Sequence, residues 1–343
     1  MKHQLLISLA ALAFMAASCT EDNAEMPDVT AVPLKITLSM PDVPQPADAV
    51  TRVAFEKDDT TPLSLTAKWK TDDEMVLILF QGDNVNWKDN CKIHKFTIPA
   101  EADGQTTANL TAAAGTVDLE GFDSSKPLKY VVATGYSWHD TDKNCKFGNG
   151  RTSYKYYETL ETQLQDMVFA TPVQEIHFPS GALEIGGKLE WLTAVLALKF
   201  NISPEAQTVK VKDGSMLFFI LTGNSSNYVN FYDPVLRKKI FSTTSFSAGI
   251  SWYDESDTPL SDALDAGGFR YFTIPADNMS EGIQITGSKV KVQEYVNSAW
   301  GDKKDVGVMN PDIPIQCGKC YGFEIDVTDA DGDGTLEFTK AAP

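Results

Sequence analysis

The stretch that decides the fold of this chain is Val32-Pro33-Leu34-Lys35-Ile36-Thr37-Leu38-Ser39-Met40. Every even-numbered position in it is apolar, and most odd-numbered positions are polar. Because successive side chains of a β-strand point to opposite faces, this alternation predicts a strand with one buried face. The predicted buried side chains are those of Val32, Leu34, Ile36, Leu38 and Met40.

Burial of this face predicts a large contribution to folding. A fully buried aliphatic side chain contributes ~1.5 to 3 kcal/mol, so five of them contribute on the order of 10 kcal/mol. That is comparable with the ~5 to 15 kcal/mol by which a typical domain is stable. Loss of the strand would therefore leave a groove that another strand has to fill, and addition of a strand at a vacated edge is a known mode of recognition.

The residues before this stretch are typical of a secretion signal. Lys2 and His3 form a short basic start, and an apolar run follows at Leu5–Met15. This run is shorter than the ~20 residues needed to cross a bilayer, so residues 1–18 are predicted to be a cleaved signal peptide. Cys19 follows small residues and resembles the cysteine of a bacterial lipobox, whose thiol is acylated. The alternative is an ordinary signal peptide in which Cys19 has no role.

Residues 19–30 form an acidic tether after that cysteine. Thr20–Glu25 resembles the acidic tag that directs some lipoproteins of Gram-negative bacteria to the outer face of the outer membrane. We therefore expect a protein held in the outer membrane by a lipid anchor and facing the cell exterior.

Composition excludes some partners and limits the role of disulfides. The 343 residues carry a formal net charge of −18, which argues against nucleic acid as a partner because phosphate recognition needs clustered Lys and Arg. Of the five cysteines, four remain besides Cys19, too few to staple a chain of this length. The hydrophobic fraction of 43% is sufficient for a fold that rests on apolar burial.

Past a proline-rich stretch at 41–52, short β-type runs alternate with turn residues. The spacing of these runs predicts an all-β fold with two β-sandwich domains in tandem, at residues 31–183 and 184–343. Tyr154–Met167 has helical spacing and is predicted to be a short helix or an irregular crossing. The first series of predicted strands is Leu63–Ala67, Met75–Phe80, Lys95–Ile98 and Tyr130–Ala133; the second begins near Gly186 and includes Tyr321–Val327.

Several weak motifs occur in one order along the chain, and together they resemble the fimbrillin family of type V pilus subunits and related cell-surface adhesins. They are Thr51-Arg52, Trp69–Leu77, Lys95–Ile98 before Asp103-Gly104, Gln165–Ala170, Tyr271–Pro275 and Gly318–Tyr321. The resemblance implies two sandwich domains of transthyretin-like, Greek-key type. It also implies a fimbrium or pilus whose subunits assemble by donor-strand exchange, so that the partners are other pilus subunits or surface proteins.

In that assembly a protease of trypsin-like specificity cuts after a basic residue that follows the first strand. The matching residue is Arg52, and the strand that would leave is the one from Val32 to Met40. The alternative is that Thr51-Arg52 opens the next strand and is never cut. Tyr321–Phe338 is the C-terminal region expected to enter a neighbour's groove, and it ends in a short candidate donor, Leu336–Thr339. So short a donor favours a tip, accessory or minor subunit over the main shaft.

An Asp/Gly-rich loop near the C-terminus resembles a calcium loop. Asp329, Asp331, Asp333 and Glu337 occupy its first, third, fifth and ninth positions, and Gly334 occupies the sixth. Lys340 stands at the twelfth position, where a bidentate carboxylate is expected. The loop is therefore either a plain turn or a weak calcium site, and no other cofactor is predicted.

The cysteines and aromatic residues leave alternatives open. Cys317-Gly318-Lys319-Cys320 is predicted to hold a local disulfide or two thiols, and a Cys91–Cys145 disulfide is the other pairing considered. Neither a nucleophile elbow nor a zincin helix occurs around the histidines, so an enzyme is not expected. Aromatic loops suggest a second function, a monomeric surface lipoprotein that binds glycan or a host protein through Tyr136, Trp138, Tyr154, Tyr156, Tyr157, Trp252 and Tyr253.

Overall fold

The structure is a computed structural model. It describes residues 31–42, 45–46, 56–57, 61–62, 67–134, 137–141, 143–146, 154–155, 168–211, 216–222, 228–235, 238–243, 245–251, 258–264, 269–275, 288–296, 298–310 and 316–341. Cys19, Arg52 and the tether at 19–30 lie outside these residues, so the predicted lipidation and processing sites stay predictions.

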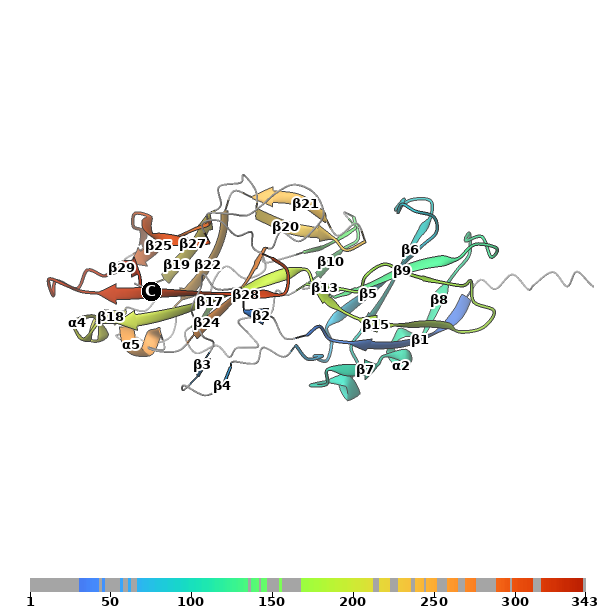
Figure 1. The fold of residues 1–343 in the computed structure, drawn as a ribbon, viewed down its shortest axis with the longest axis horizontal. Coiled ribbons are helices and arrows are strands. Elements are labelled where there is room, and N and C mark those ends of the chain that lie inside the picture. Colours follow the sequence, from blue (N-terminus) through green and yellow to red (C-terminus); the bar gives the residue numbers. More distant parts are fainter. Residues whose placement is uncertain are drawn as a thin grey trace, which may run out of the picture.

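The described chain is built of β-sheets, and the predicted all-β fold is confirmed (Figure 1). Its helical segments are single turns: η1 (Ala100–Ala102), α2 (Thr111–Ala114), α4 (Pro204–Gln207) and α5 (Leu260–Ala263). Within the described residues, none of these helices has the length and apolarity that a membrane crossing requires.

The N-terminal half consists of two sheets that face each other across a shared core (Figure 1). Alternating apolar residues of β1, β5 and β9 meet in this core, which gives the sandwich its two layers. One sheet contains β15 (Leu183–Lys188), β1 (Ala31–Ser39), β7 (Thr107–Asn109) and β8 (Thr116–Asp118). The other contains β16 (Glu190–Trp191), β13 (Phe169–Ala170), β14 (Gln174–Ile176), β9 (Leu128–Thr134), β5 (Glu74–Phe80) and β6 (Cys91–Thr97).

The C-terminal half is also built of facing sheets around its own core. One contains β2 (Gln45–Pro46), β28 (Lys319–Thr328), β17 (Thr193–Ile202), β24 (Phe269–Pro275) and β29 (Glu337–Lys340). The other contains β12 (Tyr154–Lys155), β22 (Ser245–Ser251), β19 (Met216–Thr222), β25 (Ser288–Val296), β26 (Ala299–Trp300) and β27 (Lys304–Asn310).

Short strands complete the described part of the fold. A further sheet contains β10 (Ser137–His139), β11 (Asn144–Lys146), β20 (Tyr228–Asp233) and β21 (Lys238–Thr243). Two pairs stand apart from the larger sheets: β18 (Lys210–Val211) with β23 (Thr258–Pro259), and β3 (Glu56–Lys57) with β4 (Thr61–Pro62).

The strand pairing differs from the predicted division at 183/184. That boundary falls inside β15, which pairs with β1, and β16 pairs with β13, so residues up to Trp191 lie in the sheets of the N-terminal half. Conversely, β2, β11 and β12 precede the boundary but pair with strands of the C-terminal half. A run of alternating residues does not specify which sheet it joins, so the sequence pattern alone does not place these strands. Tyr154 and Lys155 form β12, and the rest of the predicted 154–167 helix lies outside the described residues.

Candidate functional site

Strand β1 is an interior strand of its sheet, with neighbours on both sides (Figure 1). On one side it runs parallel to β15, where Leu34 lies opposite Leu183 and Ile36 lies opposite Ile185. On the other side it runs antiparallel to β8 at residues 31–33 and to β7 at residues 37–39. A strand in this position satisfies its backbone groups toward two neighbours, so its departure would split the sheet.

The turn α2 interrupts the neighbouring strand between β7 and β8, and local groups complete the ladder there. The Ile36 N–H donates to Thr111 Oγ1 at 3.1 Å, and the Leu110 N–H donates to the Ile36 carbonyl at 2.8 Å. The Leu34 N–H donates to the Gly115 carbonyl at 2.8 Å. The middle of β1 is therefore bound by the Thr111 hydroxyl, the Leu110 N–H and the Gly115 carbonyl, where a regular partner strand is missing.

The apolar face of β1 is fully integrated into the core. Exposed fractions are 1% for Val32 and Leu34, 0% for Ile36 and Leu38, and 8% for Met40. The alternate residues Ala31, Pro33, Lys35 and Thr37 are exposed. These side chains share one core cluster with residues of β5 and β9. The predicted strand and its buried face are thus confirmed, and we call the space that β1 fills the β1 groove.

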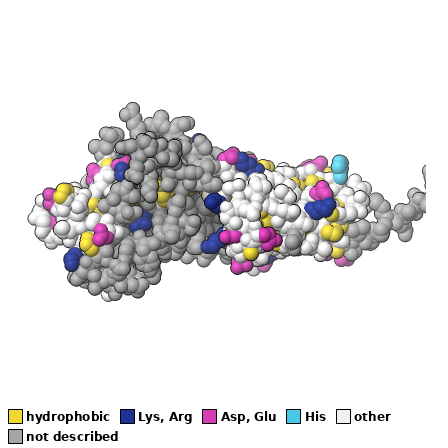
Figure 2. Space-filling view, turned by 90° about the horizontal axis from the view of Figure 1, so that it is seen from below, with side chains coloured by type: hydrophobic (Ala, Val, Ile, Leu, Met, Phe, Trp, Pro, Cys, Tyr) yellow, Lys and Arg dark blue, Asp and Glu magenta, His cyan; other side chains and the backbone are white. Residues whose placement is uncertain are grey.

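The outer face of the β1 sheet is polar. Lys35 and Glu184 form an ion pair at 3.0 Å across β1 and β15, and Ser39 Oγ lies 2.9 Å from Thr107 Oγ1 across β1 and β7. Both members of the ion pair are exposed, so solvent screens it and it adds little stability. Figure 2 shows acidic and basic side chains intermingled on the visible described surface. Burial of its apolar face and its backbone hydrogen bonds therefore keep β1 in the sheet.

Tyr130 holds β15, which forms one side of the β1 groove, through the hydroxyl of its side chain. Its hydroxyl lies 2.6 Å from Gln174 Oε1 and 2.8 Å from the Gly186 carbonyl oxygen, and it accepts the Gly186 N–H at 3.3 Å. Burial raises the pKa of this phenol. The next residue, Gly187, has φ 146°, and a Cβ there would lie 2.7 Å from Gln174 Nε2. L side chains rarely adopt this backbone conformation, so a glycine is favoured at position 187.

Bonds from Met40 and Asp42 hold the residues that directly follow β1. The Met40 N–H donates to the Thr106 carbonyl at 2.7 Å. The Asp42 carbonyl then accepts the indole N–H of Trp191 at 2.8 Å, and its carboxylate pairs with Lys188. Beyond this point β2 pairs in parallel with β28.

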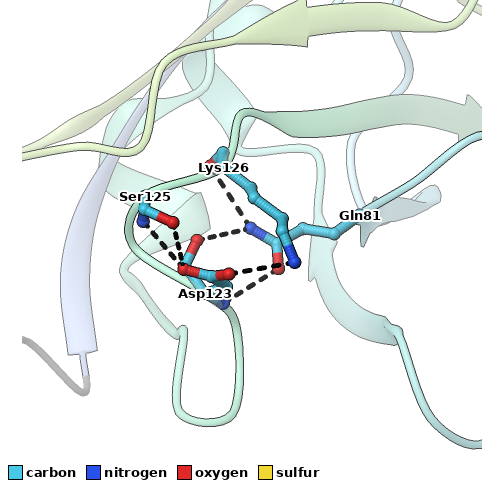
Figure 3. Close-up of polar contacts among 4 residues, drawn as sticks. All are labelled: Gln81, Asp123, Ser125 and Lys126. Atoms are coloured by element: carbon cyan, nitrogen blue, oxygen red, sulfur yellow. Dashed lines mark hydrogen bonds and ion pairs between the residues drawn. The ribbon is translucent and has the colours of Figure 1, made fainter.

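A braced loop lies between β8 and β9 (Figure 3). Gln81 Nε2 donates to the Asp123 carbonyl at 2.8 Å, and the Asp123 N–H donates to Gln81 Oε1 at 2.9 Å. The Asp123 carboxylate accepts the Ser125 hydroxyl and N–H and pairs with Lys126 at 3.0 Å. The Ser125 hydroxyl bond, followed by the Lys126 contact, lowers the pKa of Asp123 to about 2. The loop is thereby held in one conformation directly after the strand that borders β1.

The predicted C-terminal donor region is docked in its own half. Tyr321, Phe323, Ile325 and Val327 lie on β28 and belong to the C-terminal core. The short candidate donor forms β29, which pairs antiparallel with β28, and its Phe338 is buried. Departure of β28 would remove a core strand of the C-terminal half, and the entry of Tyr321–Phe338 into a neighbour stays a prediction.

The loop with the predicted calcium ligands gathers three of the four. Carboxylate oxygens of Asp329, Asp331 and Asp333 lie within 4.8 Å of one another. Glu337 lies on β29 outside this group, and Thr328 Oγ1 donates to it at 3.4 Å. The Gly334 N–H donates to both oxygens of Asp329, and the Thr335 side chain and N–H lower the pKa of Asp333. These bonds are those of an Asp/Gly turn, and they also direct oxygens to one point.

The structure has thiols at Cys91, Cys317 and Cys320, so neither considered disulfide is formed. The Cys91 Sγ lies 3.9 Å from the Lys92 carbonyl, and the side chain of Cys145 lies outside the described residues. Cys320 is 2% exposed, and burial raises the pKa of its thiol well above the usual range. A buried neutral thiol is a poor nucleophile, which argues against redox chemistry at Cys320 in this state.

Of the predicted aromatic platform, the structure describes the side chain of Trp138 alone. Trp138 is 7% exposed and its indole N–H donates to Asp140 Oδ1 at 3.1 Å, so it is a core residue. The side chains of the other predicted platform residues lie outside the described part. Sequence reasoning missed Trp300, which is 49% exposed beside the turn between β25 and β26. The available signal was Asn297-Ser298, a turn pair between two β-type runs.

No protein-family model matches the chain, and no curated protein sequence matches it. Among solved structures, it aligns with a candidate cell adhesion protein of Bacteroides fragilis at 9% identity and TM-score 0.48, over 90% of this chain and 97% of that one. A candidate cell adhesion protein of Bacteroides uniformis aligns at 12% identity and TM-score 0.47, over 92% and 98%. A fimbrial protein of Bacteroides ovatus aligns at 10% identity and TM-score 0.34, over 86% of this chain and 48% of that one. These three neighbours are described as adhesion or fimbrial proteins.

Proposed function

We propose that this chain is a cell-surface subunit of the fimbrillin type that assembles by exchange of β1. The observation that supports this most directly is that β1 and the Met40 that follows it supply five buried apolar side chains, and that β1 pairs with strands on both sides. A strand at one end of the fold can be released by a single cut, and the rest of the core stays one continuous chain. Cutting at Arg52, after the strand, would convert its covalent attachment into a replaceable contact.

The β1 groove sets conditions on the strand that replaces β1. An incoming strand that reproduces the ladder runs parallel to β15 and antiparallel to β7 and β8. It needs apolar side chains at alternate positions and a backbone carbonyl that takes the Leu110 N–H, as Ile36 now does. A polar or proline-containing centre would leave groups around Thr111 unsatisfied.

Lipid attachment at Cys19 would hold the subunit in the outer membrane before the cut, and the cut would release the rest of the subunit from the lipid. The docking of β29 on β28 supports a terminal position, as a tip, accessory or minor subunit, because the C-terminus offers no loose strand among residues 316–341. In this position the subunit accepts a strand and does not donate one.

N-terminal sequencing of protein extracted from the cell surface tests the proposal. A mature start at Val53 is expected in assembled material, and Arg52→Ala should abolish both that start and the assembly. Lys70→Ala, at an exposed position, is the matched control and should leave both unchanged. An acylated, uncut Cys19 terminus throughout the assembled material would contradict exchange of β1.

A second candidate function, binding of a glycan, is favoured by Trp300. It is one of two exposed large apolar side chains among the described residues. Polar contacts lie near it in the chain: Gln293 Nε2 donates to the carbonyl of the next residue, Gly301, at 3.0 Å, and Glu294 of β25 pairs with Lys304 at 3.4 Å. An exposed flat ring near hydrogen-bonding groups fits a sugar ring better than a protein, which needs a wider apolar patch. Titration with soluble neutral oligosaccharides should shift Trp fluorescence in the native chain and not in Trp300→Ala. An equal shift in both would contradict the role of Trp300.

A further inference from the structure

The N-terminal segment joins two sheets, and its second attachment lies on the C-terminal half. After β1, Gln45 and Pro46 form β2, which pairs in parallel with Lys319 and Cys320 of β28. Strand β28 has β17 on its other side, and β29 covers its outer edge only from Ile325 onward. The outer edge of β28 at its first residues is therefore occupied by β2.

Two contacts hold Asp42, which lies between these attachments in sequence. The Trp191 indole N–H donates to the Asp42 carbonyl at 2.8 Å, and the Asp42 carboxylate pairs with Lys188 at 2.5 Å. Trp191 also packs over Gly318, where a Cβ would lie 3.4 Å from the indole ring. The same tryptophan thus contacts Asp42 and the turn that precedes β28.

Cys320 lies at this junction and faces the N-terminal half. Its neighbours Tyr321 and Phe323 point into the C-terminal core, whereas Cys320 belongs to the core cluster that contains Met40, Trp191 and the β1 side chains. Since Cys320 pairs with Pro46, the segment that carries β1 also lies beside this thiol.

We infer that release of the segment through Pro46 opens a second strand-accepting edge, on β28 at Lys319–Cys320, and uncovers the thiol of Cys320. This inference rests on the proposed exchange of β1 and extends it to the partner. A complete replacement is a longer strand, whose first part fills the β1 groove and whose second part runs parallel to β28. A donor that ends at the position of Met40 leaves the β28 edge vacant.

The rate of Cys320 alkylation, mapped by mass spectrometry, tests the inference. The protein used is the mature chain, in which a site-specific protease site replaces Val50–Arg52. After the cut, the segment is exchanged against an excess of one of two synthetic peptides, Ala31–Met40 or Ala31–Pro46. With the short peptide, Cys320 should react at least about tenfold faster than in the uncut chain, because the local cover is missing. With the long peptide, Cys320 should react as slowly as in the uncut chain. Cys91, on β6 in a sheet that the segment does not join, is the internal reference.

Equal Cys320 rates with the two peptides would overturn the inference while leaving exchange of β1 intact. Failure of both peptides to displace the segment would instead count against the proposed function. In that case, Cys320 alkylation is measured in the uncut chain. Trp191→Phe removes the N–H that binds Asp42, so it should speed the alkylation several-fold. Trp87→Phe is the control and should leave the rate unchanged. An unchanged rate in Trp191→Phe would overturn the inference without any cut.

Discussion

Ile36 of β1 and Ile185 of β15 lie directly opposite each other in a parallel pair, and both are buried, at 0% and 3% exposure. They are separated by most of the N-terminal half of the sequence, yet they form one layer of its core. This pairing ties the stability of the sandwich to a strand at the start of the described chain.

Truncation of Ile36 should destabilise the whole N-terminal half. Ile36→Ala is expected to cost ~2 to 5 kcal/mol of unfolding free energy, because it removes a fully buried side chain and leaves a cavity. Urea unfolding followed by intrinsic fluorescence measures this. Thr37→Ala, at an exposed position of the same strand, should change stability by less than ~0.5 kcal/mol. Similar values for the two variants would contradict the burial of β1.

Thr111 should matter through its hydroxyl. Thr111→Val keeps the side-chain volume but removes the acceptor of the Ile36 N–H, and leaving that N–H unsatisfied is expected to cost ~1 to 3 kcal/mol. Amide hydrogen exchange should show faster exchange at Ile36. Thr116→Val, at an exposed position of β8, is the matched control. Unchanged protection of Ile36 in Thr111→Val would show that the hydroxyl is not its partner.

Loss of the Tyr130 hydroxyl should loosen the β15 side of the β1 groove. Tyr130→Phe removes a group that contacts Gln174 and Gly186, and a cost of ~1 to 2 kcal/mol is expected. If the proposed exchange is correct, this variant should also release β1 faster after the cut. A release rate equal to that of the native chain would argue that the β15 wall does not limit exchange.

The braced loop at Asp123 should contribute to acid sensitivity. The pKa of Asp123 is lowered from its usual 3.8 to about 2, so its stabilising effect is complete above about pH 4 and is lost as pH falls toward about 2. Asp118, Asp140, Asp305 and Asp333 also have lowered pKa values, so only the difference from Asp123→Asn isolates this loop. Stability measured from pH 5 to pH 2 should fall less steeply in Asp123→Asn. Parallel curves would exclude the effect.

Calcium should bind weakly or not at all at the Asp329 loop. The three gathered carboxylates lack the bidentate ligand that Lys340 replaces, and Lys340 Nζ instead lies 5.4 Å from the centre of the Phe323 ring. Binding tighter than ~0.1 mM is therefore not expected, since affinity depends on the number of charged ligands. Calorimetric titration of the native chain against Asp331→Asn measures this. Micromolar binding that Asp331→Asn abolishes would show a complete site.

The sequence by itself determined the β character of the chain and the buried face of β1. Both follow from alternation, because the two-residue period of a strand sends every second side chain to the same face whatever its neighbours are. The apolar residues from Val32 to Met40 carry that information locally, so their burial could be predicted without a fold.

Only the tertiary structure decided which strands lie beside β1, how its segment continues onto β28, and that β29 is docked on its own half. Parallel pairing of β1 with β15 and the bond from Trp191 to Asp42 join residues 149 positions apart in sequence. Such contacts depend on the closure of long chain segments and on the fit of whole faces, and no local pattern of residues encodes them. For the same reason, the exposure of Trp300 and the absence of Glu337 from the Asp329 cluster were decided by packing.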